Sequence, residues 1–258
     1  METLTPATDR PWVIAHRGAS ADYPENTLPA FDAAAALPLD AIELDLQRSR
    51  DGVAVVYHDR TLRKLGLPRK RVAGRTWEAL RQLDAGAHFS PRFEGTRLTT
   101  LDQVLDRYSA QVPLMLEIKR RGAPPSVANH QALVRTILDG VRARGVENRV
   151  FLLSFWPELL EYAMHCAPGI RCVWNLEHPE RPSVAVGRRI EAMFGVCVNL
   201  KTVTRDFADY MHGLSRPLLC WAVNTSADLK RAREIGVDGL ISDRPEWLCG
   251  QLNRVETA

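Results

Sequence analysis

Short apolar runs alternate with longer amphipathic stretches along most of the chain, and the two kinds of segment differ in length as strands and helices do. The apolar runs are typical of strands that are buried on both faces. Eight such runs occur: Trp12–Ala15, Ala41–Leu46, Leu114–Ile118, Arg149–Leu153, Ile170–Trp174, Gly195–Val198, Pro217–Trp221 and Gly239–Ile241. Helices are expected over Thr27–Leu37, Leu101–Tyr108, Ala128–Ala143, Pro157–Cys166, Val184–Met193, Arg205–Gly213 and Ser226–Ile235, and from Pro245, since proline suits a first helical turn.

A strand followed by a helix, repeated eight times, favours a parallel sheet with crossover helices. Eight such units in about 240 residues predict a closed (β/α)₈ barrel, the TIM-barrel fold. A doubly wound open sheet is the alternative, but no GxGxxG motif follows the first strand to support it. No linker or change of composition divides the chain, so residues 1–258 are expected to form one domain.

One part of the chain departs from the strand–helix repeat. Gly52–Tyr57 is an additional extended segment, and it follows a turn signal at Asp51-Gly52. The stretch Arg60–Arg97 fits no single strand–helix unit and is interrupted by glycine and proline. We therefore expect a small insertion beside the barrel mouth at about residues 59–100, with one short helix over Trp77–Leu83.

Composition and charge exclude several classes of protein. With 45% hydrophobic and 25% charged residues, the chain is neither a disordered protein, a coiled coil nor a collagen. The net charge of +3 is too small and too scattered to make nucleic acid the expected partner. The short basic cluster Arg69-Lys70-Arg71 is interpreted as a solvated loop.

The cysteines, the N-terminal segment and the length of the apolar runs indicate in which cellular compartment the protein is expected. Five cysteines, with no CxxC pair, are interpreted as reduced apolar fillers in a reducing environment. The polar Met1–Arg10 segment lacks the apolar core of a signal peptide, and no apolar run reaches the ~18 residues of a membrane span. A cytoplasmic protein without membrane insertion is expected, and a homo-oligomer is left open.

Carboxylates occur where strands should end, which in a barrel of this type is where the active site lies. Residues two apart on a strand point the same way, so Glu43 and Asp45 share a face, as do Glu117 and Lys119. Three converging carboxylates form a hard oxygen set that suits one divalent cation, Mg²⁺ or Ca²⁺. The alternative is that these carboxylates are exposed or paired with arginines.

Two histidines and two cations accompany those carboxylates. His16 follows the first strand and His58 ends the additional extended segment, and an imidazole titrates near neutral pH. The other five histidines are interpreted as structural. Arg17 and Lys119 add fixed positive charges that can hold a phosphate. Together these residues indicate a site for a phosphate ester.

The order of these motifs resembles the glycerophosphodiester phosphodiesterase family from Trp12 to Leu248. The resemblance rests on Ile14-Ala15-His16-Arg17-Gly18, Pro24-Glu25-Asn26-Thr27, Glu43-Leu44-Asp45, His58-Asp59, Leu83-Asp84-Ala85-Gly86, Leu116-Glu117-Ile118-Lys119, Trp221-Ala222-Val223-Asn224 and Ser242-Asp243-Arg244-Pro245. It implies a TIM barrel with a small insertion that hydrolyses glycerophosphodiesters, small-molecule substrates, to an alcohol and sn-glycerol 3-phosphate. It implies these roles: metal ligands Glu43, Asp45 and Glu117; acid and base His16 and His58; phosphate or substrate contacts Arg17, Lys119 and Trp221.

Several alternatives stay open. Trp221 is either a substrate contact or a core aromatic residue, and Asn26 either supports the site or caps the first helix. A lysophospholipase D-like activity would need an apolar groove, for which the insertion offers Trp77, Phe89 and Phe93. A non-catalytic phosphate-binding module is the third reading. The chain departs from the family pattern at Ser49, at Leu62-Arg63-Lys64-Leu65 and at Thr99-Thr100-Leu101, which bears on substrate preference.

Overall fold

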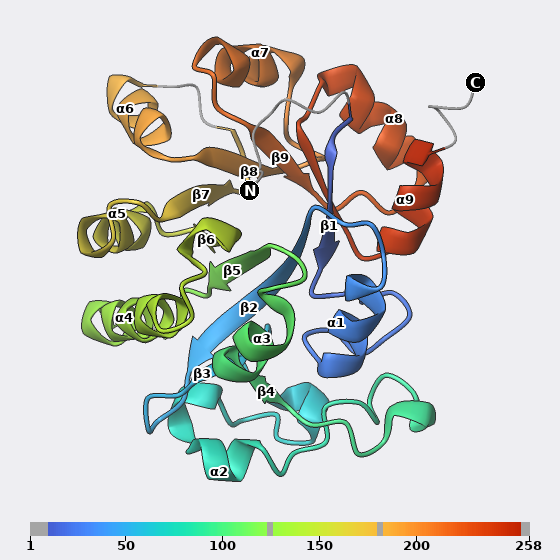
Figure 1. Ribbon diagram of the computed structural model, residues 1–258, viewed down its shortest axis with the longest axis vertical. Coiled ribbons are helices and arrows are strands. Elements are labelled where there is room, and N and C mark those ends of the chain that lie inside the picture. The colour runs from blue at the N-terminus through green and yellow to red at the C-terminus, as the bar shows by residue number, and fades with distance from the viewer. Residues whose placement is uncertain (1–9, 123–125, 180–182, 254–258) are drawn as a thin grey trace.

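The computed structural model describes residues 10–122, 126–179 and 183–253, and in them eight parallel strands close into a barrel that helices surround (Figure 1). The strands are β1 (Trp12–His16), β2 (Ala41–Arg48), β5 (Leu114–Ile118), β6 (Val150–Ser154), β7 (Arg171–Leu176), β8 (Gly195–Asn199), β9 (Leu218–Trp221) and β10 (Gly239–Ser242). They lie in the order β1-β10-β9-β8-β7-β6-β5-β2, and β2 pairs back with β1. This closure confirms the predicted TIM barrel and excludes the open sheet.

Helices follow the strands in sequence, as the amphipathic stretches predict. They are α1 (Leu28–Ala35), α3 (Leu101–Tyr108), α4 (Val127–Arg142), α5 (Pro157–Cys166), α6 (Val184–Ala192), α7 (Arg205–Gly213), α8 (Ser226–Ile235) and α9 (Pro245–Asn253). The predicted strands and helices agree with the observed ones within two residues at each end that could be compared. Thr27 holds the N-cap position of α1, so the capping role considered for Asn26 is wrong.

Alternation along each strand divides the apolar residues between two cores. Trp12 and Ile14 of β1 belong to a cluster inside the barrel, while Val13 and Ala15 belong to the larger cluster between strands and helices. The inner cluster also holds Met115 and residues of β6 to β10. The barrel is therefore filled by side chains below its mouth, as expected for eight strands.

The insertion starts at the end of β2, where the chain turns back on itself. The additional extended segment forms β3 (Ala54–Val56), antiparallel to β2, and β4 (Thr99–Thr100) pairs with β3. The strand β4 is not among the sequence predictions. The helix α2 (Trp77–Leu80) is shorter than the predicted Trp77–Leu83. The insertion has its own small apolar core, and so it is held beside the barrel without joining the main core.

Two further sequence expectations concern the cysteines and the membrane. All five cysteines are free, and four of them are buried. Within the described ranges, no helix is both long enough and apolar enough to cross a bilayer. The expectation for Met1–Arg10 concerns residues that lie, but for Arg10, outside the described residues.

Candidate active site

The neighbouring strands β2 and β5 bring the three predicted carboxylates together. Their register places Asp45 beside Glu117, and Glu43 lies on the same strand as Asp45. One oxygen of each carboxylate lies within 4.8 Å of the others. All three side chains are buried. The three carboxylates thus converge as strand alternation led us to expect, and their role as metal ligands stays a prediction.

The electrostatics of this trio favour a cation. Burial, with the negative charges of Asp45 and Glu117, raises the pKa of Glu43 well above its usual range. The backbone N–H of Arg17 donates to Glu43 Oε2 at 3.1 Å, but the buried Oε1 has no hydrogen-bond partner among the described residues. An orphaned carboxylate oxygen beside two further carboxylates fits a hard divalent cation, which coordinates oxygen.

Two cations share the cavity with these carboxylates. The Nζ of Lys119 lies 2.8 Å from Asp45 Oδ1 and 2.5 Å from Glu117 Oε1, and the Nε of Arg17 lies 3.1 Å from Asp45 Oδ2. Burial opposes ionisation of Asp45, yet Lys119 and Arg17 hold the pKa of its carboxyl well below the usual range. Three carboxylates against two cations leave one negative charge, which a divalent cation would more than offset.

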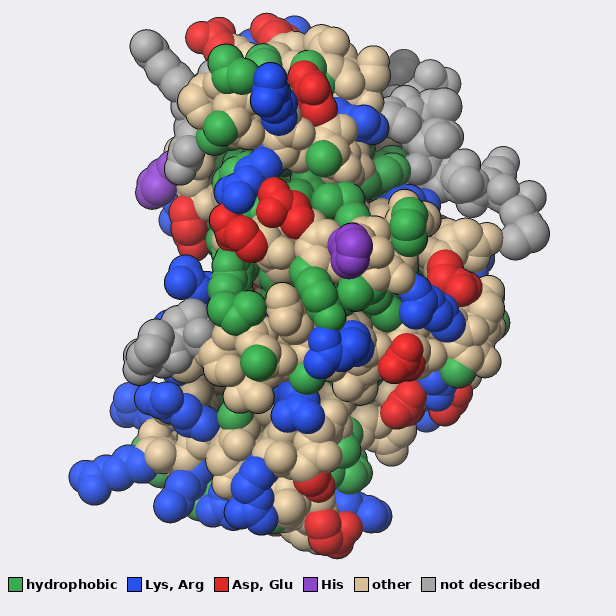
Figure 2. Space-filling model, turned by 90° about the vertical axis from the view of Figure 1, so that its left-hand side faces the viewer, with side chains coloured by type: hydrophobic (Ala, Val, Ile, Leu, Met, Phe, Trp, Pro, Cys, Tyr) green, Lys and Arg blue, Asp and Glu red, His purple; other side chains and the backbone are tan. Residues whose placement is uncertain are grey.

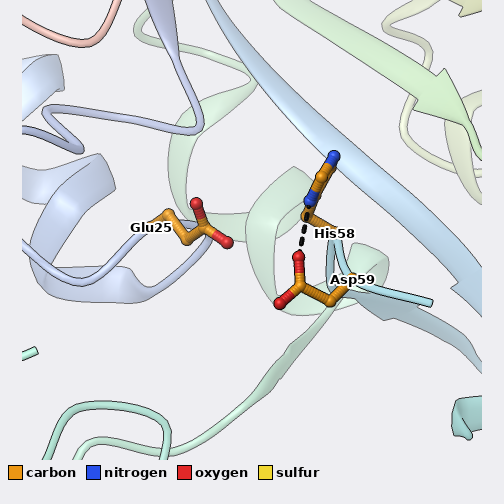
Figure 3. A group of neighbouring side chains, drawn as sticks. All are labelled: Glu25, His58 and Asp59. Carbon is orange, nitrogen blue, oxygen red and sulfur yellow. Dashed lines mark hydrogen bonds and ion pairs between the residues drawn. The ribbon is translucent and has the colours of Figure 1, made fainter. Parts of the chain in front are cut away.

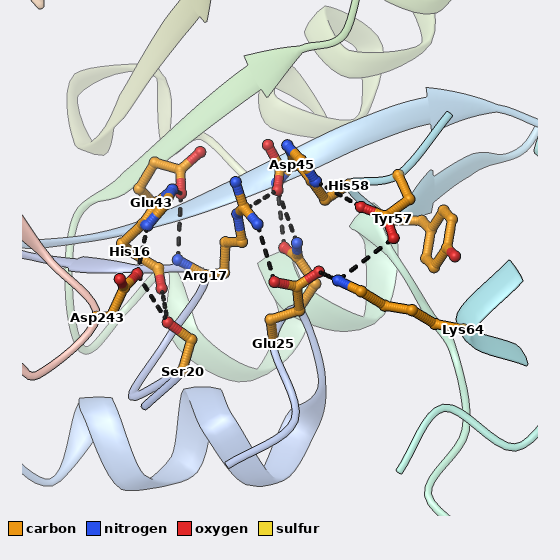
Figure 4. Close-up of polar contacts among 12 residues, drawn as sticks. His16, Arg17, Ser20, Glu25, Glu43, Asp45, Tyr57, His58, Lys64 and Asp243 are labelled. Atoms are coloured by element: carbon orange, nitrogen blue, oxygen red, sulfur yellow. Dashed lines mark hydrogen bonds and ion pairs between the residues drawn. The ribbon is translucent and has the colours of Figure 1, made fainter. Parts of the chain in front are cut away.

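His16 ends β1 at the barrel mouth and is held by an acidic partner. Its Nδ1 is hydrogen bonded to Asp243 Oδ1 at 2.6 Å, and its Nε2 lies 4.0 Å from Glu43 Oε2 (Figure 4). Asp243 also accepts hydrogen bonds from Ser20 and Asn224. Burial opposes ionisation here too, but the hydrogen bond from His16 helps to lower the pKa of Asp243 to about 2. The ionised Asp243 therefore fixes the orientation of the His16 ring.

His58 follows β3 and faces the site from the opposite side of Arg17 (Figure 4). Its Nδ1 is hydrogen bonded to Asp59 Oδ1 at 2.8 Å, which leaves the other ring nitrogen directed away from Asp59 (Figure 3). Burial lowers the pKa of His58 and so favours the neutral imidazole. Each histidine thus has one nitrogen held by a carboxylate and one available for proton transfer.

A second acidic group, formed by Glu25, His58 and Asp59, also has its ligand atoms close together (Figure 3). Here the charges are already compensated. Glu25 contacts Arg17 and Lys64, each at 2.8 Å, and Lys64 also lies 3.3 Å from Asp59. We interpret this group as a polar network that supports Arg17 and His58.

One cavity of about 230 Å³ collects most of the predicted site residues. The cavity is lined by His16, Arg17, Glu43, His58, Glu117, Lys119 and Trp221, and Asp45 is fully buried and does not line it. Trp221 packs edge-on against Phe155, with ring centroids 6.1 Å apart, and its buried Nε1 has no partner in the described part of the chain. Trp221 is half-buried: it lines the cavity and also packs against the apolar cluster inside the barrel.

Asp243 and Gly18 were not assigned a role from sequence, whereas Asn26 takes the supporting position that was considered for it. Asp243 follows β10 directly, so the rule that led to His16 could also have led to it. Asn26 donates to Asp45 Oδ2 at 2.7 Å and accepts from the Asp45 backbone N–H at 3.2 Å. Gly18 makes the turn after β1, at φ +81°, where an added Cβ would lie 2.6 Å from the Ala30 backbone.

Gln47 is the supporting residue with the most direct hold on His58. Its Nε2 donates to the carbonyls of Tyr57, His58 and Asp59 at 2.7, 3.2 and 2.9 Å. In Gln47→Leu these donors are lost at nearly constant volume. A displacement of His58 by about 1 Å is expected to lower kcat by ~10- to 100-fold.

Steady-state kinetics on purified Gln47→Leu measure this effect. The matched control is Gln111→Leu, since Gln111 is exposed in the segment after α3 and its side chain donates to the carbonyl of Arg107, away from the site. A Gln47→Leu protein with the kcat of the parent would show that the three hydrogen bonds do not position His58.

A closed barrel whose mouth combines two carboxylate-held histidines, three buried carboxylates and two cations defines a hydrolase of phosphate esters. The family model described as the glycerophosphoryl diester phosphodiesterase family matches residues 16–247, and the chain belongs to this family. It is a phosphoric diester hydrolase.

The sequences of individual relatives match this chain over most of their length. A glycerophosphodiester phosphodiesterase of Caldanaerobacter subterraneus is 30% identical over 241 residues, which cover 92% of this chain and 95% of the relative. A Bacillus subtilis glycerophosphodiester phosphodiesterase is 28% identical over 92% of this chain and 85% of its own length.

Solved structures show the same fold. An Oleispira antarctica phosphodiesterase, in complex with the product sn-glycerol 3-phosphate, superposes with a TM-score of 0.82 at 24% identity, covering 96% of this chain and 99% of that one. The glycerophosphodiester phosphodiesterase of Thermotoga maritima superposes with a TM-score of 0.73 at 23% identity, over 95% of this chain and 100% of that one.

Proposed function

We propose that the protein hydrolyses glycerophosphodiesters to an alcohol and sn-glycerol 3-phosphate, with His16 and His58 as the acid and base. The observation that carries this proposal is one cavity in which two oriented histidines face a buried carboxylate trio with an orphaned oxygen. The bound product of the Oleispira antarctica relative supports the identity of the product.

Glu43, Asp45 and Glu117 would hold one divalent cation, Mg²⁺ or Ca²⁺. When bound, the cation would supply positive charge to the phosphate oxygens and favour ionisation of a nearby hydroxyl. Arg17 and Lys119 line the same cavity and add their charges to the phosphate as its negative charge develops. Trp221 lines the same cavity and offers its aromatic ring to the glycerol.

The two histidines divide the proton transfers between them. A glycerol hydroxyl attacks phosphorus while one imidazole takes its proton. The bond from phosphorus to the alcohol oxygen breaks, and the other imidazole protonates that oxygen. Water then opens the resulting cyclic phosphate with the two roles reversed. Asp243 and Asp59 stabilise whichever ring is positively charged, through the hydrogen bonds at Nδ1.

The lysophospholipase D-like alternative depends on an apolar surface in the insertion. Trp77 packs against the apolar core of the insertion. Phe93 is in contact with Tyr23 and Phe89, and Phe89 is 40% exposed. Only Phe89 thus offers much free surface to an acyl chain, and we favour the deacylated substrate.

Turnover of glycerophosphocholine, glycerophosphoethanolamine and lysophosphatidylcholine by the purified protein tests the proposal. We expect sn-glycerol 3-phosphate from the two deacylated substrates in the presence of Mg²⁺ or Ca²⁺. Turnover of the lysolipid alone would instead support the lysophospholipase D-like activity. Absence of turnover on all three would contradict the proposed function and leave the phosphate-binding module.

A further inference from the structure

A second and larger cavity opens beside the catalytic one, and we call it the basic cleft. It measures about 450 Å³ and lies at the end of β2, between the insertion and the start of α4. Its charged lining residues are all positive: Arg48, Arg50, Arg60, Arg71, Lys119 and Arg121. Among the described residues, no Asp or Glu lines it. Figure 2 views the molecule from the left-hand side of Figure 1, and many Lys and Arg side chains lie in its lower left part, over the insertion.

The five arginines of the basic cleft form no direct ion pair within the described residues, although Arg121 is attracted at longer range by Asp45, Glu117 and Asp59. By contrast, Arg17, Arg107 and Arg144 on other surfaces each contact a carboxylate. Like charges that line one cavity without a direct ion pair repel one another and focus a positive potential there. In a chain with a net charge of only +3, this concentration points to an anionic ligand.

Hydrogen bonds fix the position of Arg121, one of the arginines that line the basic cleft. The backbone N–H of Arg121 donates to His130 Nε2 at 3.0 Å, and the guanidinium of Arg121 donates to the carbonyl of His58. Its Nε is buried without a hydrogen-bond partner in the described residues, as is the Nε of Arg48. Burial lowers the pKa of Arg121. Arg121 is half-buried at the wall of the cleft, and its guanidinium charge can attract an anion there.

The basic cleft and the catalytic cavity adjoin each other through shared lining residues. A third cavity of about 520 Å³ shares His58, Glu117 and Phe155 with the catalytic cavity, and it shares Arg60 and Arg121 with the basic cleft. Lys119 lines all three. A diester whose phosphorus lies beside the two histidines can therefore extend its alcohol moiety towards the arginines.

We propose that the basic cleft binds a second phosphate, carried by the alcohol moiety of the diester. This inference rests on the proposed function and specifies its substrate class: glycerophosphodiesters of a phosphorylated alcohol. Phosphate is favoured because guanidinium groups bind its oxygens in pairs, and because several arginines can share its charge of about −1.5 to −2. A cationic alcohol such as choline would meet repulsion in the same place.

A matched substrate pair tests the proposal. Glycerophosphoinositol 4-phosphate and glycerophosphoinositol differ only in the second phosphate. Glycerophosphocholine is the reference substrate, because its hydrolysis reports the proposed function without a second phosphate. We expect kcat/KM for the phosphorylated substrate to exceed that for its partner by about tenfold or more, the effect of at least one charge-assisted hydrogen bond. In Arg60→Gln/Arg71→Gln this preference should fall close to one, while turnover of glycerophosphoinositol stays near that of the parent.

Both substituted arginines are exposed, so the double variant is expected to fold. The matched control is Arg69→Gln/Arg233→Gln, which removes two exposed positive charges outside the basic cleft and should keep the preference. Equal kcat/KM for the two inositol substrates in the parent would overturn the second-phosphate site and leave the proposed function standing.

Calorimetric titration with inositol 1,4-bisphosphate, on chelated protein, decides the matter independently of turnover. Binding by the parent that weakens about tenfold in Arg60→Gln/Arg71→Gln, but not in the control, supports the site even if no diester is hydrolysed. Absence of binding, or equal binding by all three proteins, overturns it. Failure of all three diesters to react would contradict the proposed function alone.

Discussion

Replacing either His16 or His58 with alanine is expected to lower kcat by about 10²- to 10⁴-fold, the usual contribution of a general acid or base. Each ring lines the catalytic cavity, and a carboxylate holds its Nδ1 in place. No other titratable residue of the site is placed to take over its proton transfer. Neither ring packs in an apolar core, so thermal stability should change little. Stopped assays on glycerophosphocholine measure the loss.

An activated leaving group separates the two histidines. p-Nitrophenolate leaves without a proton, so glycerol 3-(p-nitrophenyl) phosphate should restore turnover in the variant that lacks the acid. It should not restore turnover in the variant that lacks the base. His165→Ala is the matched control, because His165 is exposed on α5 and far from the cavity lining. Full activity of either site variant on glycerophosphocholine, or rescue of both, would contradict the acid–base pair.

Glu43→Gln is expected to abolish metal-supported turnover and yet to stabilise the chelated protein. Burial beside Asp45 and Glu117 raises the pKa of Glu43, so at neutral pH the unfolded chain, in which Glu43 ionises freely, is favoured, and the uncharged amide removes this cost. In the parent, Mg²⁺ or Ca²⁺ at about 100 times its Kd adds ~2.7 kcal/mol to the free energy of unfolding. For a chain of this size that corresponds to a rise in Tm of about 5–10 °C.

Thermal unfolding with and without the cation measures both effects. Glu147→Gln is the control, since Glu147 is exposed and carries no ion pair in the described residues. We expect the cation to raise the Tm of the parent and of the control, and to have a much smaller effect on Glu43→Gln. An equal rise in all three proteins would place the cation elsewhere.

The barrel and the centre of its site could be predicted because both follow from local patterns. Alternation on β2 and β5 determines that Glu43 and Glu117 point towards the mouth. His16 was found because active sites of such barrels lie at the C-terminal ends of the strands. Gln47 also lies two residues from Asp45 on the same strand, but its uncharged side chain gave no chemical signal. Gln47 matters because the segment after β3 passes close to its side chain, and the sequence does not show this path.

Features that depend on long-range contacts could not be predicted in the same way. The two-residue strand β4 exists because Thr99 and Thr100 pair with β3, far back in the sequence. The capping box of Thr100 with Gln103 then starts α3 directly. Likewise, the ion pairs of Lys119 with Asp45 and Glu117 depend on rotamers of a long side chain, which the spacing of residues does not determine.

The most direct test of the account is the release of sn-glycerol 3-phosphate from glycerophosphocholine by chelated protein, before and after addition of Mg²⁺ or Ca²⁺. The buried trio Glu43, Asp45 and Glu117 predicts no release by the chelated protein and recovery with one of the two ions. Release that is unaffected by chelation would contradict a metal centre at the mouth of this barrel.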